Sequence, residues 1–186
     1  MDMAWAVEKE KSVIHLEVGQ PDFATPEHIV DATCRYVREG HTKYVPNAGV
    51  NPLREAAARY FQQRSGIETS SDNILVTPGA VMSIASAFFS LLEPGDEVLL
   101  PDPGWPNYNM AASLIHAKPV FYNLRANHQF LPDIDQIDRL VTPRTKLLLL
   151  CTPSNPTGQV YDAEVMRALM QLANRHDLWV LSDEIY

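Results

Sequence analysis

Short apolar runs alternate with segments of helical periodicity along most of this sequence. The short runs predict strands, and they lie at 13–18, 73–76, 97–100, 119–124, 146–151 and 178–181. Apolar residues at helical spacing predict helices at 26–39, 52–64, 80–92, 107–115, 133–140 and 162–176. Two helix starts carry proline in the first turn, at Thr25-Pro26 and Asn51-Pro52. Gly40 and Gly66 mark the corresponding helix ends.

This alternation of strands and helices indicates a fold class. Short apolar strands separated by helices are typical of crossover units, which build a mainly parallel sheet covered on both faces. The sequence therefore predicts a three-layer α/β/α domain. In such sheets ligands bind at the carboxyl ends of the strands. Functional residues are expected in the loops that follow 73–76, 97–100, 146–151 and 178–181.

Composition narrows the class of protein further. The 186 residues carry a formal net charge of −8, and the basic residues are scattered, which argues against a nucleic-acid surface. The two cysteines, Cys34 and Cys151, lie in apolar settings and are expected to be buried and reduced rather than paired. No apolar run has membrane-spanning length, and the charged start at 1–11 does not resemble a signal peptide. We therefore expect a cytoplasmic protein that acts on neither nucleic acid nor membrane; no metal site is predicted.

The loops predicted after 73–76 and 97–100 contain a glycine turn and a proline-rich segment, respectively. At 77–80 (TPGA), Gly79 and Ala80 allow backbone N–H groups at a helix start to approach an anion. Taken alone, this segment is better explained as an ordinary strand-to-helix turn. At 101–108 (PDPGWPNY), Trp105 offers a flat face for stacking on a planar ring. A lone tryptophan more commonly packs into the core.

The last two loops contain an amide and an acid. At 152–158 (TPSNPTG), Asn155 offers its amide to a ligand oxygen, although Asn-Pro is also a frequent turn starter. At 182–186 (SDEIY), Asp183 directly follows an apolar strand, where a cation or a protonated ring nitrogen would be a suitable partner. A carboxylate that caps the next helix is the alternative interpretation. Each signal is weak alone, but together they follow successive strand ends.

Six short segments stand out by their glycine, proline and acidic residues. They are 19–23 (GQPDF), 43–49 (KYVPNAG), 94–98 (PGDEV), 101–108 (PDPGWPNY), 154–158 (SNPTG) and 182–186 (SDEIY). In this order they resemble segments of the class I/II aminotransferases of fold type I, which use pyridoxal 5'-phosphate (PLP). The resemblance covers about 13–186. The Asn-Pro-Thr-Gly turn together with the Asp-Glu-Ile-Tyr segment makes it highly specific.

The resemblance implies PLP as the cofactor and assigns contacts with it to five residues of these loops. Gly79 and Ala80 would hold the phosphate through backbone N–H groups. Trp105 would stack on the pyridine ring. Asn155 and Tyr186 would form hydrogen bonds with the phenolic oxygen of the ring.

Further roles follow from the same resemblance. Asp183 would pair with the pyridine nitrogen and keep it protonated, so that the ring acts as an electron sink. The backbone of Gly19 would lie beside the substrate carboxylate. Tyr44 would reach the cofactor phosphate of a partner subunit, which implies a homodimer. The Asn155–Pro156 peptide bond is expected to be cis.

By comparison with the family, residues 1–40 are expected to form an N-terminal segment on the small-domain side. Residues 41–186 are expected to form the large PLP-binding domain, truncated at its C-terminal end. The family's Schiff-base lysine lies downstream of the Asp-Glu-Ile-Tyr segment. None of the lysines in this sequence is a credible substitute for it: Lys9, Lys11, Lys43, Lys118 and Lys146. No catalytic residue is therefore assigned.

The function implied is transfer of an amino group between an amino acid and a 2-oxo acid. The chain alone is expected to be inactive, and to expose an unpaired strand edge and apolar surface. Three alternatives remain open at this stage. They are a PLP lyase or decarboxylase of the same fold, a regulatory sensor domain, and a non-catalytic remnant.

Overall fold

A computed structural model describes residues 19 and 21–186, which fall into two compact units. The boundary lies between Val45 and Pro46. The strand predicted at 13–18 lies outside the described residues. In the described part of the chain, no helix is both long enough and apolar enough to cross a membrane.

The first unit contains helix α2 (Glu27–Arg38). The helix starts after Pro26, and Gly40 with a φ of 84° follows its C-cap residue Glu39, close to the predicted bounds. None of its residues is buried within this unit. Cys34 is therefore exposed, and the expectation that both cysteines are buried is wrong for Cys34 and correct for Cys151. Both cysteines are free.

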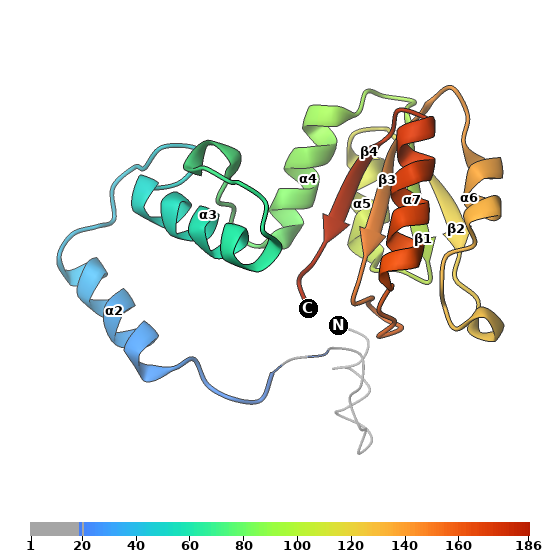
Figure 1. The fold of residues 1–186 in the computed structure, drawn as a ribbon. Helices are drawn as coiled ribbons and strands as arrows, with labels where there is room; N and C mark the ends of the chain where they lie inside the picture. The colour runs from blue at the N-terminus through green and yellow to red at the C-terminus, as the bar shows by residue number, and fades with distance from the viewer. Residues whose placement is uncertain (1–18, 20) are drawn as a thin grey trace, which may run out of the picture. The chain divides into compact units, whose positions relative to one another are not determined.

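The second unit is built on a parallel four-stranded sheet (Figure 1). Its strands are β1 (Glu97–Asp102), β2 (Lys118–Asn123), β3 (Thr145–Cys151) and β4 (Trp179–Asp183), in the order β2-β1-β3-β4. The chain passes from β1 outward to β2 and then returns to the other side of β1. The carboxyl ends of β1 and β3 therefore flank the switch point at which open parallel sheets bind ligands.

Helices cover both faces of this sheet (Figure 1). On one face lie α4 (Ala80–Leu91) and α5 (Pro106–Leu114), and on the other lie α6 (Ile134–Leu140) and α7 (Ala163–Arg175). The apolar run of β3 sends alternate side chains to the two cores, with Leu147 and Leu149 on the first face and Leu148 and Leu150 on the second. The predicted three-layer α/β/α fold is confirmed.

A helical segment precedes these layers in the second unit. It consists of α3 (Asn51–Ser65) and the 3-10 turn η1 (Ser71–Asn73), and a second 3-10 turn, η2 (Ala126–His128), follows β2. The Arg54 guanidinium joins α3 to η1 by donating to the carbonyl oxygens of Ser71 at 2.6 Å and Ile74 at 3.1 Å. Gly49 lies so close to Val76 that an added Cβ would be 2.8 Å from the Val76 Cβ.

The strand predicted at 73–76 is wrong. Its first residue belongs to η1, and the residues that follow pair with none of the four strands in the described ranges. The Val76 N–H instead donates to the carbonyl oxygen of Ala48, at 3.0 Å, and Leu75 is 57% exposed. An apolar run has the local preference of a strand, but it forms one only where a neighbouring strand pairs with it. The other predicted strands and helices of this unit are present within a few residues of their predicted bounds.

Candidate functional site

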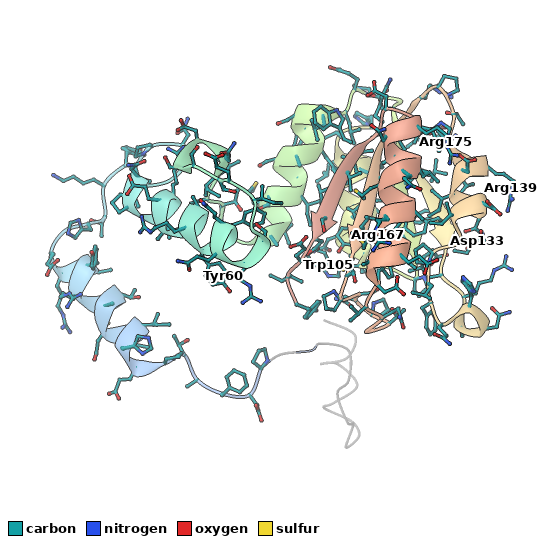
Figure 2. All side chains as sticks on the ribbon, in the orientation of Figure 1. Tyr60, Trp105, Asp133, Arg139, Arg167 and Arg175 are labelled. Carbon is teal, nitrogen blue, oxygen red and sulfur yellow. The ribbon has the colours of Figure 1, made fainter. Side chains whose placement is uncertain are left out.

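Three loops meet at the carboxyl ends of β1, β3 and β4. The loop after β1 leads into α5, whose N-terminal cap is Trp105 and whose first turn contains Tyr108. Figure 2 shows Trp105 at the end of the sheet to which the strand arrows point in Figure 1. Cys151 at the end of β3 lies opposite Asp183 at the end of β4. The topology therefore brings the predicted ligand-binding loops to one edge of the sheet.

Asp183 is the buried acid of this edge, with only 8% of its surface exposed. Its Oδ2 accepts a hydrogen bond from the Tyr108 hydroxyl at 2.7 Å, and its Oδ1 accepts one from the Ile185 N–H at 3.2 Å. Each carboxylate oxygen has a second lone pair, so the group retains capacity for a further donor. Buried carboxylates are normally paired with a cation, yet within residues 19 and 21–186 Asp183 forms no ion pair. The site therefore suits a cationic N–H donor.

Tyr108 is a site residue to which the sequence assigned no role. It is 2% exposed, and burial, with the neighbouring Cys151 and Asp183 groups, raises its pKa far above the ordinary value. The hydroxyl therefore stays protonated and donates to Asp183. The sequence feature that could have identified Tyr108 is its spacing from Trp105, because a residue three positions further along lies on the same face of a helix.

The start of α4 lies beside Asp183. A cavity of about 430 Å³ is lined by Ala80 and Ser83 of α4, by Asp183, and by neighbouring residues of both elements. Gly79, with a φ of 84°, is the N-cap residue, and no side chain caps the helix. In the ranges described here, the N–H groups of Ala80 and Val81 have no hydrogen-bond acceptor, whereas the Gly79 N–H donates to the Thr77 carbonyl oxygen at 2.8 Å. This helix start therefore offers free N–H groups and a favourable dipole to an anion.

The loop after β3 places two more predicted residues together. The Asn155 amide Nδ2 lies 3.4 Å from the Tyr186 hydroxyl, and both line a second cavity of about 330 Å³. The Asn155–Pro156 peptide bond is cis, as predicted. A carboxamide and a phenol at this distance are suitable for sharing one ligand oxygen.

The remaining predicted residues occupy different settings. Trp105 is half-buried against the α4–α5 core, and its ring meets the Tyr108 ring edge-to-face at 5.5 Å and 82°. Gly19 and Tyr44 belong to the first unit, where both are exposed. They are not among the residues that the second unit brings together. Within the described residues, no group of three or more His, Cys, Asp or Glu side chains is arranged to hold a metal ion.

Comparison with known proteins identifies the family. Residues 11–186 match the sequence profile described as "Aminotransferase class I and II". The chain belongs to the class I and II aminotransferase family. This result confirms the resemblance of the six segments.

Individual members of the aminotransferase family match nearly the whole chain. A probable aspartate/prephenate aminotransferase of Thermus aquaticus is 40% identical over 178 residues, which are 96% of this chain and 46% of that protein. A bifunctional aspartate aminotransferase and glutamate/aspartate-prephenate aminotransferase of Petunia hybrida is 43% identical over 175 residues, covering 94% and 36% of the two chains. A solved structure of the Thermus thermophilus aspartate aminotransferase with maleate superposes with a TM-score of 0.94 at 37% identity, covering 100% and 48%. The chain therefore spans about half the length of such relatives, or less.

The lysines of the second unit lie at the opposite end of the sheet from Asp183. Lys118 is the first residue of β2, and its Nζ donates to Oε1 of the buried Glu97, the first residue of β1, at 2.8 Å. Lys146 is the second residue of β3 and is exposed. Because parallel strands run the same way, neither side chain reaches the carboxyl ends of the strands. The second unit therefore supplies polar contacts for a ligand but no amine at the site.

Proposed function

We propose that this chain forms the PLP-holding part of an aminotransferase, which moves an amino group between an amino acid and a 2-oxo acid. The observation that carries the proposal is Asp183. It is a buried carboxylate, oriented by two donors and without a cationic partner in the described ranges, beside a helix start suited to an anion. A molecule with a basic ring nitrogen and a phosphate has the two complementary groups.

The residues of the second unit divide the binding of PLP among them. Asp183 accepts the ring N–H and holds the proton on the ring nitrogen. The N–H groups at the start of α4 would bind the phosphate. The Ala80 N–H is free for this contact in the described ranges, whereas the Gly79 N–H would have to give up its hydrogen bond to the Thr77 carbonyl oxygen. Trp105 would stack on the ring. The Asn155 amide and the Tyr186 hydroxyl donate to the phenolic oxygen. When bound, PLP supplies the electron-withdrawing ring that makes removal of a substrate proton possible.

Two residues of the first unit would contribute one substrate contact and one cofactor contact. The Gly19 backbone would lie beside the substrate carboxylate, and Tyr44 would contact the cofactor phosphate of a second subunit in a homodimer. Tyr44 is fully exposed, which is compatible with a contact to another chain. The named relatives make aspartate the first amino donor to test. Two free cysteines fit a cytoplasmic location.

A covalent bond to PLP, and transfer of the substrate proton, would need a lysine amine at this site, and the second unit places none there. We therefore propose that this chain binds PLP without a covalent bond and does not transaminate alone. Lys118 and Lys146 lie at the far end of the sheet, so neither can take up or deliver the substrate proton.

The test is an absorbance titration of the chain with PLP, followed by borohydride reduction and mass analysis. We expect saturable binding that Asp183→Ala and Asn155→Ala weaken by about tenfold or more, since each variant removes a polar contact to the ligand. Asp135→Ala is the matched control, because it removes an exposed carboxylate of α6 and should leave the affinity unchanged. Absence of saturable binding would overturn the proposal. A covalent adduct on one specific lysine would overturn the assignment of non-covalent binding.

A further inference from the structure

Tyr108 connects two of the elements that carry the candidate site. It lies in the first turn of α5, while its hydroxyl contacts Asp183 at the end of β4, 2.7 Å away. Its ring also meets the Trp105 ring edge-to-face. One buried side chain therefore contacts both the proposed stacking residue and the proposed partner of the ring nitrogen.

The Tyr108 hydroxyl can only donate, not accept, the hydrogen bond that it shares with Asp183. Burial raises its pKa, so the phenol keeps its proton and is always the donor in the pair with Asp183. The Ile185 N–H donates to the other carboxylate oxygen at 3.2 Å. Two donors on two different oxygens fix both the rotamer and the plane of the carboxylate, which leaves its remaining lone pairs in defined directions.

We propose that Tyr108 is a positioning residue, whose hydroxyl holds the Asp183 carboxylate in the orientation that receives the ring nitrogen of PLP. This role rests on the proposed function. Without the hydroxyl, only the Ile185 N–H still holds the carboxylate, so Asp183 can also populate other staggered χ1 wells, and only one of the three wells directs the carboxylate as it lies here. If all three wells were equally populated, the competent fraction would fall to about a third and the affinity for PLP would fall about threefold. The hydrogen bond from Tyr108 to Asp183 also strengthens the other hydrogen bonds of the carboxylate, so its loss adds to that effect.

A purely structural role for Tyr108 predicts a different outcome. In that case its hydroxyl would only stabilise the core, and its loss would leave the bound cofactor unchanged. Tyr122 is the matched comparison, because it is also a buried tyrosine with one hydrogen bond. Its hydroxyl donates to the Leu149 carbonyl oxygen at 2.9 Å, and its ring packs in the core on the opposite face of the sheet.

The experiment compares Tyr108→Phe with Tyr122→Phe in the 186-residue chain. Affinity is measured by absorbance titration with PLP, and the ring nitrogen is followed by NMR of PLP labelled with ¹⁵N at that atom. We expect Tyr108→Phe to weaken binding by about three- to tenfold and to shift the ¹⁵N resonance of bound PLP. Tyr122→Phe should leave both the affinity and the resonance as in the unmodified chain.

A second measurement tests the hydrogen bond without the cofactor. A buried phenol that donates to a carboxylate is expected to give a slowly exchanging, downfield hydroxyl proton in the NMR spectrum. This signal should disappear in Tyr108→Phe and move in Asp183→Asn, because the acceptor is then neutral. An unchanged signal in Asp183→Asn would contradict the proposed contact.

The outcomes separate the two proposals. If the unmodified chain binds PLP and Tyr108→Phe matches it in affinity and ¹⁵N resonance, the role of Tyr108 is refuted while the cofactor site stands. Equal effects of Tyr108→Phe and Tyr122→Phe on the ¹⁵N resonance would also refute it, because they would reflect a general loss of packing. If the unmodified chain binds no PLP, the proposed function fails, and the role that rests on it fails with it.

Discussion

Two buried tyrosines in the same core allow a sharp prediction about stability. Tyr122 and Tyr161 both pack in the core between the sheet and α6–α7. The Tyr122 hydroxyl donates to the Leu149 carbonyl oxygen at 2.9 Å, whereas in the described ranges the Tyr161 hydroxyl has no hydrogen-bond partner. Burial raises the pKa of Tyr161 to about 12, with a further contribution from Cys151, so this hydroxyl is neutral in the ordinary pH range.

The two phenylalanine variants should therefore change the free energy of unfolding differently: Tyr122→Phe should lower it and Tyr161→Phe should not. Tyr122→Phe removes a formed hydrogen bond, and we expect it to lower the free energy of unfolding by about 0.5–1.5 kcal/mol. Tyr161→Phe removes a buried hydroxyl that has lost its water without gaining a partner. Since such a group costs about 1–3 kcal/mol, the variant should be neutral or more stable than the unmodified chain.

Urea unfolding followed by circular dichroism measures both effects. With a slope of about 1–3 kcal/mol per molar urea, a change of 1 kcal/mol moves the midpoint by about 0.3–1 M. The midpoint should fall for Tyr122→Phe and stay constant or rise for Tyr161→Phe, with unchanged slopes. A loss of stability in Tyr161→Phe as large as that in Tyr122→Phe would refute the reasoning, because it would mean that the Tyr161 hydroxyl is satisfied.

Two further predictions concern the amino end of the sheet and the start of α7. Hydrogen bonds from Lys118 and Thr142 hold the pKa of the buried Glu97 carboxyl below its ordinary value of 4.5, so its contribution to stability is present above pH 4.5 and is lost as pH falls through the folded-state pKa. In urea unfolding at pH 7, Glu97→Gln should lower the free energy of unfolding by about 1.5–3 kcal/mol. The difference from the unmodified chain should shrink below pH 4.5, where the Glu97 carboxyl becomes protonated. A difference that does not depend on pH would contradict the ion pair with Lys118. Asp162 accepts two N–H bonds at the start of α7, both at 2.9 Å, so Asp162→Ala should cost about 0.5–2 kcal/mol in the same assay, and no loss would exclude a capping role.

The layers of the second unit could be predicted from sequence because their signals are local. The apolar run at 146–151 predicted the strand β3, and apolar residues at helical spacing over 162–176 predicted α7. The segment at 73–76 carries the same kind of signal and is still not a strand, because pairing depends on a neighbour that no local pattern specifies.

For the candidate site, too, the sequence predicted the positions of local motifs but not the contacts between residues that are distant in sequence. Motif order predicted that Asp183, Asn155 and Tyr186 lie at strand ends, and the structure brings the last two within hydrogen-bonding distance. The contact between Tyr108 and Asp183 joins residues 75 positions apart, so it depends on the order of the strands and on which face α5 covers. The resemblance named the loop that contains Tyr108 without giving that residue a role.

The most direct test of the central claim asks whether Asp183 binds the ring nitrogen of PLP. The measurement is the affinity of the chain and of Asp183→Ala for PLP and for its analogue in which carbon replaces the ring nitrogen. We predict that the unmodified chain prefers PLP by about tenfold or more, since a charge-assisted hydrogen bond is lost with the analogue, and that Asp183→Ala binds both compounds equally. Equal binding of the two compounds by the unmodified chain would contradict the proposed role of Asp183 and the cofactor site built around it.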